Sequence, residues 1–203
     1  LPDLAKAVSR LRHALRANEP VLIFGDSDVD GITASAIMYE SLSAMGLSVS
    51  VRLSNRLADG YGFPAVLIKQ VLRMGVKLLI LVDCGTNQRQ EIQTLADHGI
   101  ETIVLDHHIP VEPPARPAAL INPYRGGEAY RELCSAGLAF KLTHALWPSE
   151  PERLVEVLDL VALGTLADYA PLRGENRIFV TLGLTQLCHT RRVALKQLCD
   201  EVG

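Results

Sequence analysis

Three aspartates stand on alternate residues directly after an apolar run near the start of the chain. In VLIFGDSDVDGITASA, residues 21–36, these carboxylates belong to Asp26, Asp28 and Asp30. Carboxylates that are this close repel one another unless a cation lies between them. We therefore expect the segment to bind a cation, and its oxygen ligands favour a divalent metal ion.

The same spacing also matches the opening of an EF-hand calcium loop. The twelfth residue of such a loop should be a glutamate that binds calcium through both oxygens, and here it is Ile37. An EF-hand loop also follows a helix, whereas the apolar run PVLIF before Asp26 is typical of a strand. Both features argue against an EF-hand.

Further acidic and histidine residues follow other apolar runs. Asp83 comes after LLILV, Asp106, His107 and His108 come after TIVL, and Asp168 ends the apolar run LVALGTLA. A single aspartate after a strand is most often a helix N-cap. Several such coincidences at one sheet edge are much less expected, so these side chains are candidates for one shared site.

Carboxylates mixed with imidazoles indicate the metal and its chemistry. This set of ligands favours Mn²⁺, allows Mg²⁺, and favours zinc less because no thiolates take part. Two divalent ions roughly 3.5–4 Å apart are the usual apparatus for cleaving phosphate esters. We therefore expect two divalent metal ions and hydrolysis of phosphodiesters.

The elements that must position these residues alternate between strand and helix patterns. The predicted strands are residues 21–24, 48–53, 78–82, 102–105 and, more weakly, 118–121. The predicted helices between them are residues 31–45, 64–75 and 88–98. This alternation predicts an α/β fold in which a parallel sheet of about five strands has helices on both faces. Ligands bind at the carboxyl ends of such strands, where the acidic residues fall.

Composition places the chain among globular proteins. Its 203 residues are 48% hydrophobic and 21% charged, which suits one sizeable core. We predict a single domain over 1–203, with an α/β sheet core to about residue 122 and a mostly helical part from about residue 132. No apolar run approaches the roughly 18 residues that span a membrane, and the start does not resemble a signal peptide. We therefore expect a cytoplasmic protein without membrane contact.

Net charge does not decide the partner. The formal charge of −3 would argue weakly against a nucleic-acid partner. Two bound divalent ions would add four positive charges and reverse that sign. The overall balance therefore excludes neither a nucleic acid nor a small phosphate ester.

The motifs FGDSDVDGITA, LVDCGT, LDHH and ALGTLADYAPL resemble, in order and spacing, those of the DHH phosphoesterase family. The stretches NRLADGYGF, INP, SAGLAFKL and GENR extend the resemblance through nearly the whole chain, and it is strongest to the RecJ-type single-strand-specific exonucleases. One departure is Ser27, where RecJ-type proteins usually have an aromatic residue. The resemblance implies the fold of a DHH phosphoesterase domain.

The resemblance also implies which residues hold the metals. Asp28 and Asp30 would bind separate ions, and Asp83 would bridge the two. His107 would bind the second ion, and Asp168 would complete the shell around it.

Four further roles concern the chemistry around the ions. By the resemblance, Asp26 is a ligand or the partner of one, His108 contacts the scissile phosphate or protonates the leaving oxygen, and Asp106 orients a neighbouring imidazole. From its own position, Arg125 in the turn YRGG is a candidate for a phosphate contact, with a solvated turn as the alternative.

Two remaining features have no assigned chemistry. Tyr61 in DGYGF would either pack against substrate or close a turn. The basic stretch TRRVALK, residues 190–196, is most simply a solvated helix face.

By the resemblance, we expect the catalytic core of a 5′→3′ exonuclease that acts on single-stranded DNA in repair and recombination. One alternative is a DHH enzyme for short oligonucleotides or cyclic dinucleotides, and another is a non-catalytic relative that serves as a replication scaffold. RecJ-type enzymes continue into a DHHA1 domain that helps to hold the strand. We find no stretch that matches it, so we expect slow cleavage and weak binding of long strands.

Overall fold

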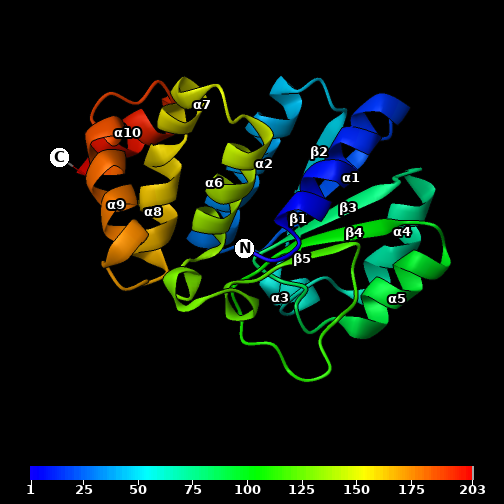
Figure 1. Ribbon diagram of the computed structural model, residues 1–203. Coiled ribbons are helices and arrows are strands. Elements are labelled where there is room, and N and C mark those ends of the chain that lie inside the picture. The colour runs from blue at the N-terminus through cyan, green and yellow to red at the C-terminus, as the bar shows by residue number, and fades with distance from the viewer. Residues whose placement is uncertain (203) are drawn as a thin grey trace.

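The computed structural model describes residues 1–202 and contains one five-stranded sheet (Figure 1). All strand pairs are parallel, and their spatial order is β2-β1-β3-β4-β5. The strands are β1 (Val21–Gly25), β2 (Val49–Leu53), β3 (Leu78–Val82), β4 (Glu101–Leu105) and β5 (Ala119–Ile121). The predicted α/β fold with about five parallel strands is confirmed, and each boundary lies within a residue of its prediction.

Ten α-helices accompany the sheet in the described residues. They are α1 (Leu4–Ala17), α2 (Val29–Ala44), α3 (Arg56–Asp59), α4 (Ile68–Arg73), α5 (Arg89–Asp97), α6 (Ser135–Leu146), α7 (Pro151–Glu156), α8 (Leu158–Ala167), α9 (Gly174–Leu187) and α10 (Val193–Val202). Within residues 1–202, none of these helices combines the length and apolar character needed to cross a bilayer.

The two faces of the sheet bury alternate residues of each strand, because neighbouring side chains in a strand point to opposite sides. Ile23 and Ile80 belong to the apolar cluster formed with α1, α2 and α6. Leu22 and Leu79 belong to a second cluster formed with α4 and α5. Helices thus cover both faces, as predicted, and α8 and α9 form a further layer beyond α2 and α6 (Figure 1).

The strand order places a topological switch point between β1 and β3. The chain leaves β1 toward β2 on one side, and then crosses to β3 on the other side of β1. In open α/β sheets such a switch point opens a crevice at the carboxyl ends of the strands, where ligands bind. Asp26 follows β1 directly and Asp83 follows β3 directly, so both lie at this point.

Candidate metal centre

The loop after β1 folds back tightly on itself. Asp28 is the N-cap of α2, and its Oδ1 accepts a hydrogen bond of 2.9 Å from the Gly31 amide. A Cβ atom on Gly31 would lie 2.5 Å from the backbone oxygen of Asp26, so only glycine allows this approach. The turn leaves Asp26 and Asp30 buried and Asp28 more exposed, all near the crevice.

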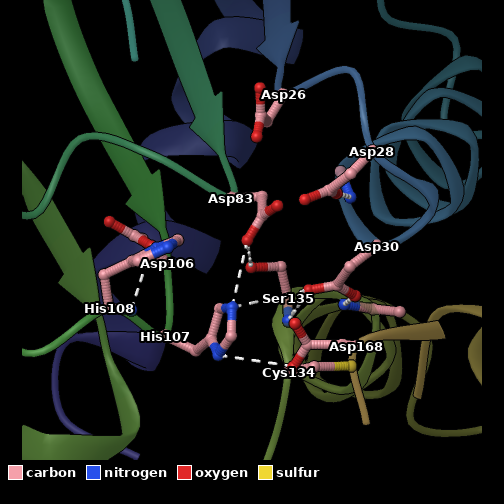
Figure 2. Close-up of polar contacts among 12 residues, drawn as sticks. Asp26, Asp28, Asp30, Asp83, Asp106, His107, His108, Cys134, Ser135 and Asp168 are labelled. Carbon is pink, nitrogen blue, oxygen red and sulfur yellow. Dashed lines mark hydrogen bonds and ion pairs between the residues drawn. The ribbon is translucent and has the colours of Figure 1, made fainter. Parts of the chain in front are cut away.

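Asp83 begins the loop after β3 in a left-handed backbone conformation, with φ of 61°. Asparagine and aspartate tolerate this conformation better than most residues. The Asp83 carboxylate is buried, and its Oδ1 lies 3.2 Å from Nε2 of His107. Its position toward the centre of the acidic residues is visible in Figure 2.

The three polar residues in the loop after β4 have different contacts from one another. Asp106 is buried, and its Oδ1 lies 2.7 Å from Nδ1 of His108 and accepts a bond from the His108 amide. The other oxygen of Asp106 accepts a hydrogen bond of 2.9 Å from the Thr86 amide. Asp106 therefore fixes His108 against the neighbouring β3 loop, while His107 turns toward the other carboxylates (Figure 2).

His107 lies among three carboxylates that come from three elements. Besides Asp83, its Nε2 lies 3.8 Å from Oδ2 of Asp30, and its Nδ1 lies 3.8 Å from Oδ2 of Asp168. Asp168 caps the C-terminus of α8, which brings a residue from the helical part of the chain to the sheet edge. The tertiary structure thus gathers three of the predicted acidic residues around this one imidazole.

The donor atoms fall into three groups in which all ligand atoms lie within 4.8 Å of one another. The groups are Asp26 with Asp28 and Asp83, Asp30 with His107 and Asp168, and Asp83 with His107 and His108. Asp83 and His107 each belong to two groups, so the three are contiguous. Carboxylate and imidazole donors at this spacing suit divalent metal ions, and so the residues fit the predicted cofactor.

Arg56 is a charged partner that the sequence did not single out. From the short helix α3, its Nη2 contacts Oδ2 of Asp26 and lies 2.9 Å from Oδ2 of Asp28, and its Nε donates to Asp26 Oδ1 at 3.2 Å. Ser54 donates to the same Asp26 oxygen at 2.7 Å. Both oxygens of Asp26 therefore have protein donors. The stretch NRLADGYGF pointed to this loop, but nothing in it specified an ion pair with Asp26.

Burial and neighbouring charges shift the pKa values of the central pair. Burial raises the pKa of Asp83 to about 7, although the hydrogen bond from His107 opposes this. Burial alone would lower the pKa of His107, but the hydrogen bond to Asp83 and the charges of Asp168 and Asp30 outweigh it and raise the value to about 9. In the metal-free protein, the pair therefore holds protons that a metal ion would have to displace.

Burial and hydrogen-bond partners also shift the pKa values of the residues around this pair. Burial raises the pKa of Asp168. The pKa of Asp106 is lowered, because its bonds to His108 outweigh its burial. The same contact raises the pKa of His108. For Asp26, hydrogen bonds from Arg56 and Ser54 outweigh burial and lower the pKa.

Two residues outside the acidic set have contacts that bear on their predicted roles. Arg125 binds Asp3 Oδ2 and the Leu120 carbonyl oxygen, each at 2.9 Å, which ties the turn to the N-terminal segment. Its contact with a phosphate stays a prediction. The hydroxyl of Tyr61 lies 3.0 and 3.2 Å from the two ring nitrogens of His108, so Tyr61 touches the site itself.

The model of the DHH family, N-terminal domain, matches residues 20–165, and the chain belongs to this family. It is 36% identical, over all of its length, to the single-stranded-DNA-specific exonucleases RecJ of Bacillus subtilis and Thermus thermophilus, of which it covers 26% and 30%. The family resemblance predicted from the motifs is confirmed. The chain thus spans between a quarter and a third of these curated relatives.

Solved structures give the same result for the fold. A crystal structure of exonuclease RecJ bound to manganese matches the whole chain with a TM-score of 0.91 and 36% identity, and the match covers 52% of that protein. RecJ of Thermus thermophilus in complex with Mn²⁺ matches the whole chain with a TM-score of 0.86 and 34% identity, over 30% of its length.

Proposed function

We propose that the chain is the catalytic module of a metal-dependent phosphodiesterase that degrades single-stranded DNA from the 5′ end. The observation that carries the proposal is the set of three contiguous donor groups around Asp83 and His107. The names of its relatives support the substrate, because they are exonucleases specific for single-stranded DNA. The 5′→3′ polarity and a cytoplasmic location are parts of the proposal that rest on the resemblance and on composition.

Two metal positions follow from the donor groups. Asp28 and Asp83 would hold one ion, and Asp30, His107 and Asp168 would hold the other, with Asp83 between them. This division agrees with the roles that the family resemblance implies. When bound, divalent ions would stabilise the charge that develops on a phosphate under attack and lower the pKa of a water molecule.

Asp26 fits better as an anchor for Arg56 than as a metal ligand. Its oxygens already accept hydrogen bonds from Arg56 and Ser54, and its side chain is 1% exposed. The guanidinium in turn lies beside Asp28 and offsets part of the negative charge of the loop. The sequence left Asp26 as either a metal ligand or the partner of one, and we assign it the role of partner.

His108 is suited to handle a proton at the leaving oxygen. Its Nδ1 faces Asp106, which holds the ring and raises its pKa, and this favours a proton on the imidazole. In a complex with substrate, the ring would donate this proton to the leaving oxygen or bind the phosphate. The structure also places His108 in a donor group with Asp83 and His107, which makes a metal contact the competing role.

The test of the proposed function compares substrates under one set of conditions. Purified chain with Mn²⁺ would be given single strands labelled at the 5′ or 3′ end, the matching duplex and a dinucleotide. We expect release of mononucleotides from the 5′ end of the single strand and little attack on the duplex. Preference for the dinucleotide would favour the short-oligonucleotide alternative, and absence of hydrolysis despite bound Mn²⁺ would favour the scaffold.

A further inference from the structure

The first two residues of α6 donate to two of the acidic side chains. The Ser135 amide lies 2.7 Å from Oδ2 of Asp30, and the Ala136 amide lies 2.8 Å from Oδ1 of Asp30. The Ser135 hydroxyl donates to Oδ1 of Asp83 at 2.9 Å. Two consecutive residues thus hold three oxygens of two carboxylates, and Figure 2 shows Ser135 between them.

These contacts also complete the start of α6. The amides in the first turn of a helix have no partner within the helix and need a cap. Cys134, the N-cap residue, makes no side-chain capping bond. Asp30 satisfies two of these amides from a position more than 100 residues earlier in the chain. The partial positive charge of the helix N-terminus further favours a carboxylate there.

Helix α8 also packs closely against the Asp30 carboxylate. A Cβ atom on Gly164 would lie 3.0 Å from Oδ1 of Asp30 and 2.5 Å from Oγ1 of Thr33. Asp30 is itself 2% exposed. The carboxylate is therefore held by two amide donors and packed against a second helix, which leaves it little freedom to turn away.

We propose that Ser135 is a positioning residue of the metal centre, which orients Asp30 and Asp83 before any metal ion binds. The inference rests on the proposed function, because it assigns these two carboxylates to the metals. A carboxylate oxygen has two lone pairs, so an oxygen that accepts one hydrogen bond keeps a second pair for a cation. The Ser135 hydroxyl and amide fix the direction of that second pair. On Asp83 Oδ1, this pair faces Nε2 of His107, itself a proposed metal ligand, at 3.2 Å in the metal-free chain.

The hydroxyl is tested by Ser135→Ala, which leaves both amides in place. We expect Mn²⁺ to bind about 10- to 100-fold more weakly, the usual effect of removing a hydrogen-bond partner of a metal ligand. The measurement is isothermal titration calorimetry of the metal-free chain with Mn²⁺. Ser35→Ala is the matched control, because Ser35 is also buried and its hydroxyl has no hydrogen-bond partner in the described residues.

The amide is tested by Ser135→Pro, because proline lacks the N–H group and is favoured at the first position of a helix. Cys134 already has the extended conformation, with φ of −79° and ψ of 176°, that a residue before proline adopts. We expect Mn²⁺ affinity below that of Ser135→Ala, since a contact to Asp30 is lost as well. Arg89→Pro makes the same change at the exposed first residue of α5 and should leave Mn²⁺ affinity unchanged.

The outcomes separate this inference from the proposed function. If the unchanged chain fails to bind Mn²⁺, the proposed function fails. If the unchanged chain binds Mn²⁺ and Ser135→Ala binds it as tightly as Ser35→Ala does, the positioning role is wrong. Tighter binding by Ser135→Ala would also overturn it, because the hydroxyl would then be competing with the metal.

Thermal unfolding without metal should be similar for the two alanine variants. Should Ser135→Pro not fold, the alanine pair still decides the question.

Discussion

Two acidic clusters in the chain, each with buried carboxylates, are neutralised in different ways. One is the candidate metal centre. The other, here called the Arg192 cluster, consists of Glu40 on α2, Asp159 on α8, and Thr190 and Arg192 between α9 and α10. Asp159 is 1% exposed, as deeply buried as Asp26 and Asp83. Burial of carboxylates by itself therefore does not distinguish a site from a structural element.

The partners of the buried carboxylates make the distinction. Arg192 donates from Nε to both oxygens of Asp159 at 3.2 and 3.1 Å, and its two other nitrogens contact both oxygens of Glu40. Thr190 and the Leu160 amide complete the shell of Asp159 at 2.8 and 2.7 Å. Asp159 thus has a counter-charge and a full set of donors, which is what a buried charge requires.

The candidate metal centre has fewer counter-charges than carboxylates. Six carboxylates gather there with one guanidinium and two imidazoles; the carboxylates are those of Asp26, Asp28, Asp30, Asp83, Asp106 and Asp168. The hydrogen bond to Asp83 and the charges of Asp168 and Asp30 raise the pKa of His107, and the charges of Asp30 and Asp28 add to the burial that raises the pKa of Asp83. The comparison teaches that the chain neutralises one acidic cluster internally, whereas the other keeps an excess of negative charge that bound cations would neutralise.

The largest effect should come from Asp83→Asn. Asparagine keeps the size and tolerates the left-handed conformation, but it removes the charge shared by the two metal positions. We expect turnover to fall by several orders of magnitude and Mn²⁺ binding to weaken, while the metal-free chain unfolds at the same or a higher temperature. Near-normal hydrolysis of labelled single-stranded DNA in Mn²⁺ would contradict the two-metal assignment.

Alanine variants of the two histidines should lose different properties. As a metal ligand, His107→Ala should lower both Mn²⁺ occupancy and rate. His108→Ala should keep most of the Mn²⁺ affinity and lower the rate on the order of 10²- to 10⁴-fold, the typical contribution of a general acid. Calorimetry with Mn²⁺ and single-turnover kinetics on both variants provide the measurement. Equal losses of affinity would show that His108 also binds metal.

For the Arg192 cluster we expect a loss of stability without a loss of Mn²⁺ affinity. Arg192→Met removes the counter-charge and leaves Asp159 buried without it, which should lower the free energy of unfolding by about 3 kcal/mol. Mn²⁺ affinity of the folded fraction should change little, because no residue of this cluster belongs to a donor group. Urea unfolding tests the loss of stability, and Mn²⁺ titration at low temperature tests the metal affinity. A large loss of Mn²⁺ affinity in the folded protein would show that the clusters are coupled.

The last effect is a pH dependence of the metal-free protein. The folded state raises the pKa of Asp83 from 3.8 to about 7 and that of His107 from 6.5 to about 9. Folding is therefore favoured by these bound protons at low pH, and the gain is lost as pH rises through each folded value. We expect the melting temperature to fall between about pH 4 and about pH 9, first through Asp83 and then through His107.

Mn²⁺ should reverse this trend, because the metal displaces the same protons and so binds more tightly as pH rises. Thermal unfolding across this pH range with and without Mn²⁺ provides the measurement. His107→Ala should flatten the metal-free slope at its alkaline end. A flat slope in the unchanged chain would mean that the His107 and Asp83 pKa values are not raised.

The sequence determined most of the architecture and the location of the site. Apolar runs of strand length that alternate with helices specify a parallel sheet, because each pattern depends on residues close together in the chain. The carboxyl ends of parallel strands meet at one edge, so Asp26, Asp83 and His107 could be placed together without a structure. The apolar run before Asp168 made it a further candidate for this edge, and the motif order supported it, although it comes from the helical part.

The partners of these residues were decided only by the tertiary structure. Arg192 was expected on a solvated helix face, yet it is half-buried in contact with Glu40, 152 residues away. Ser135 reaches Asp83 from a helix 52 residues later, and Arg56 reaches Asp26 from a helix too short to predict. Such contacts depend on how helices pack across the sheet. Periodicity shows which face of a helix is buried, but not which distant polar group that face will meet.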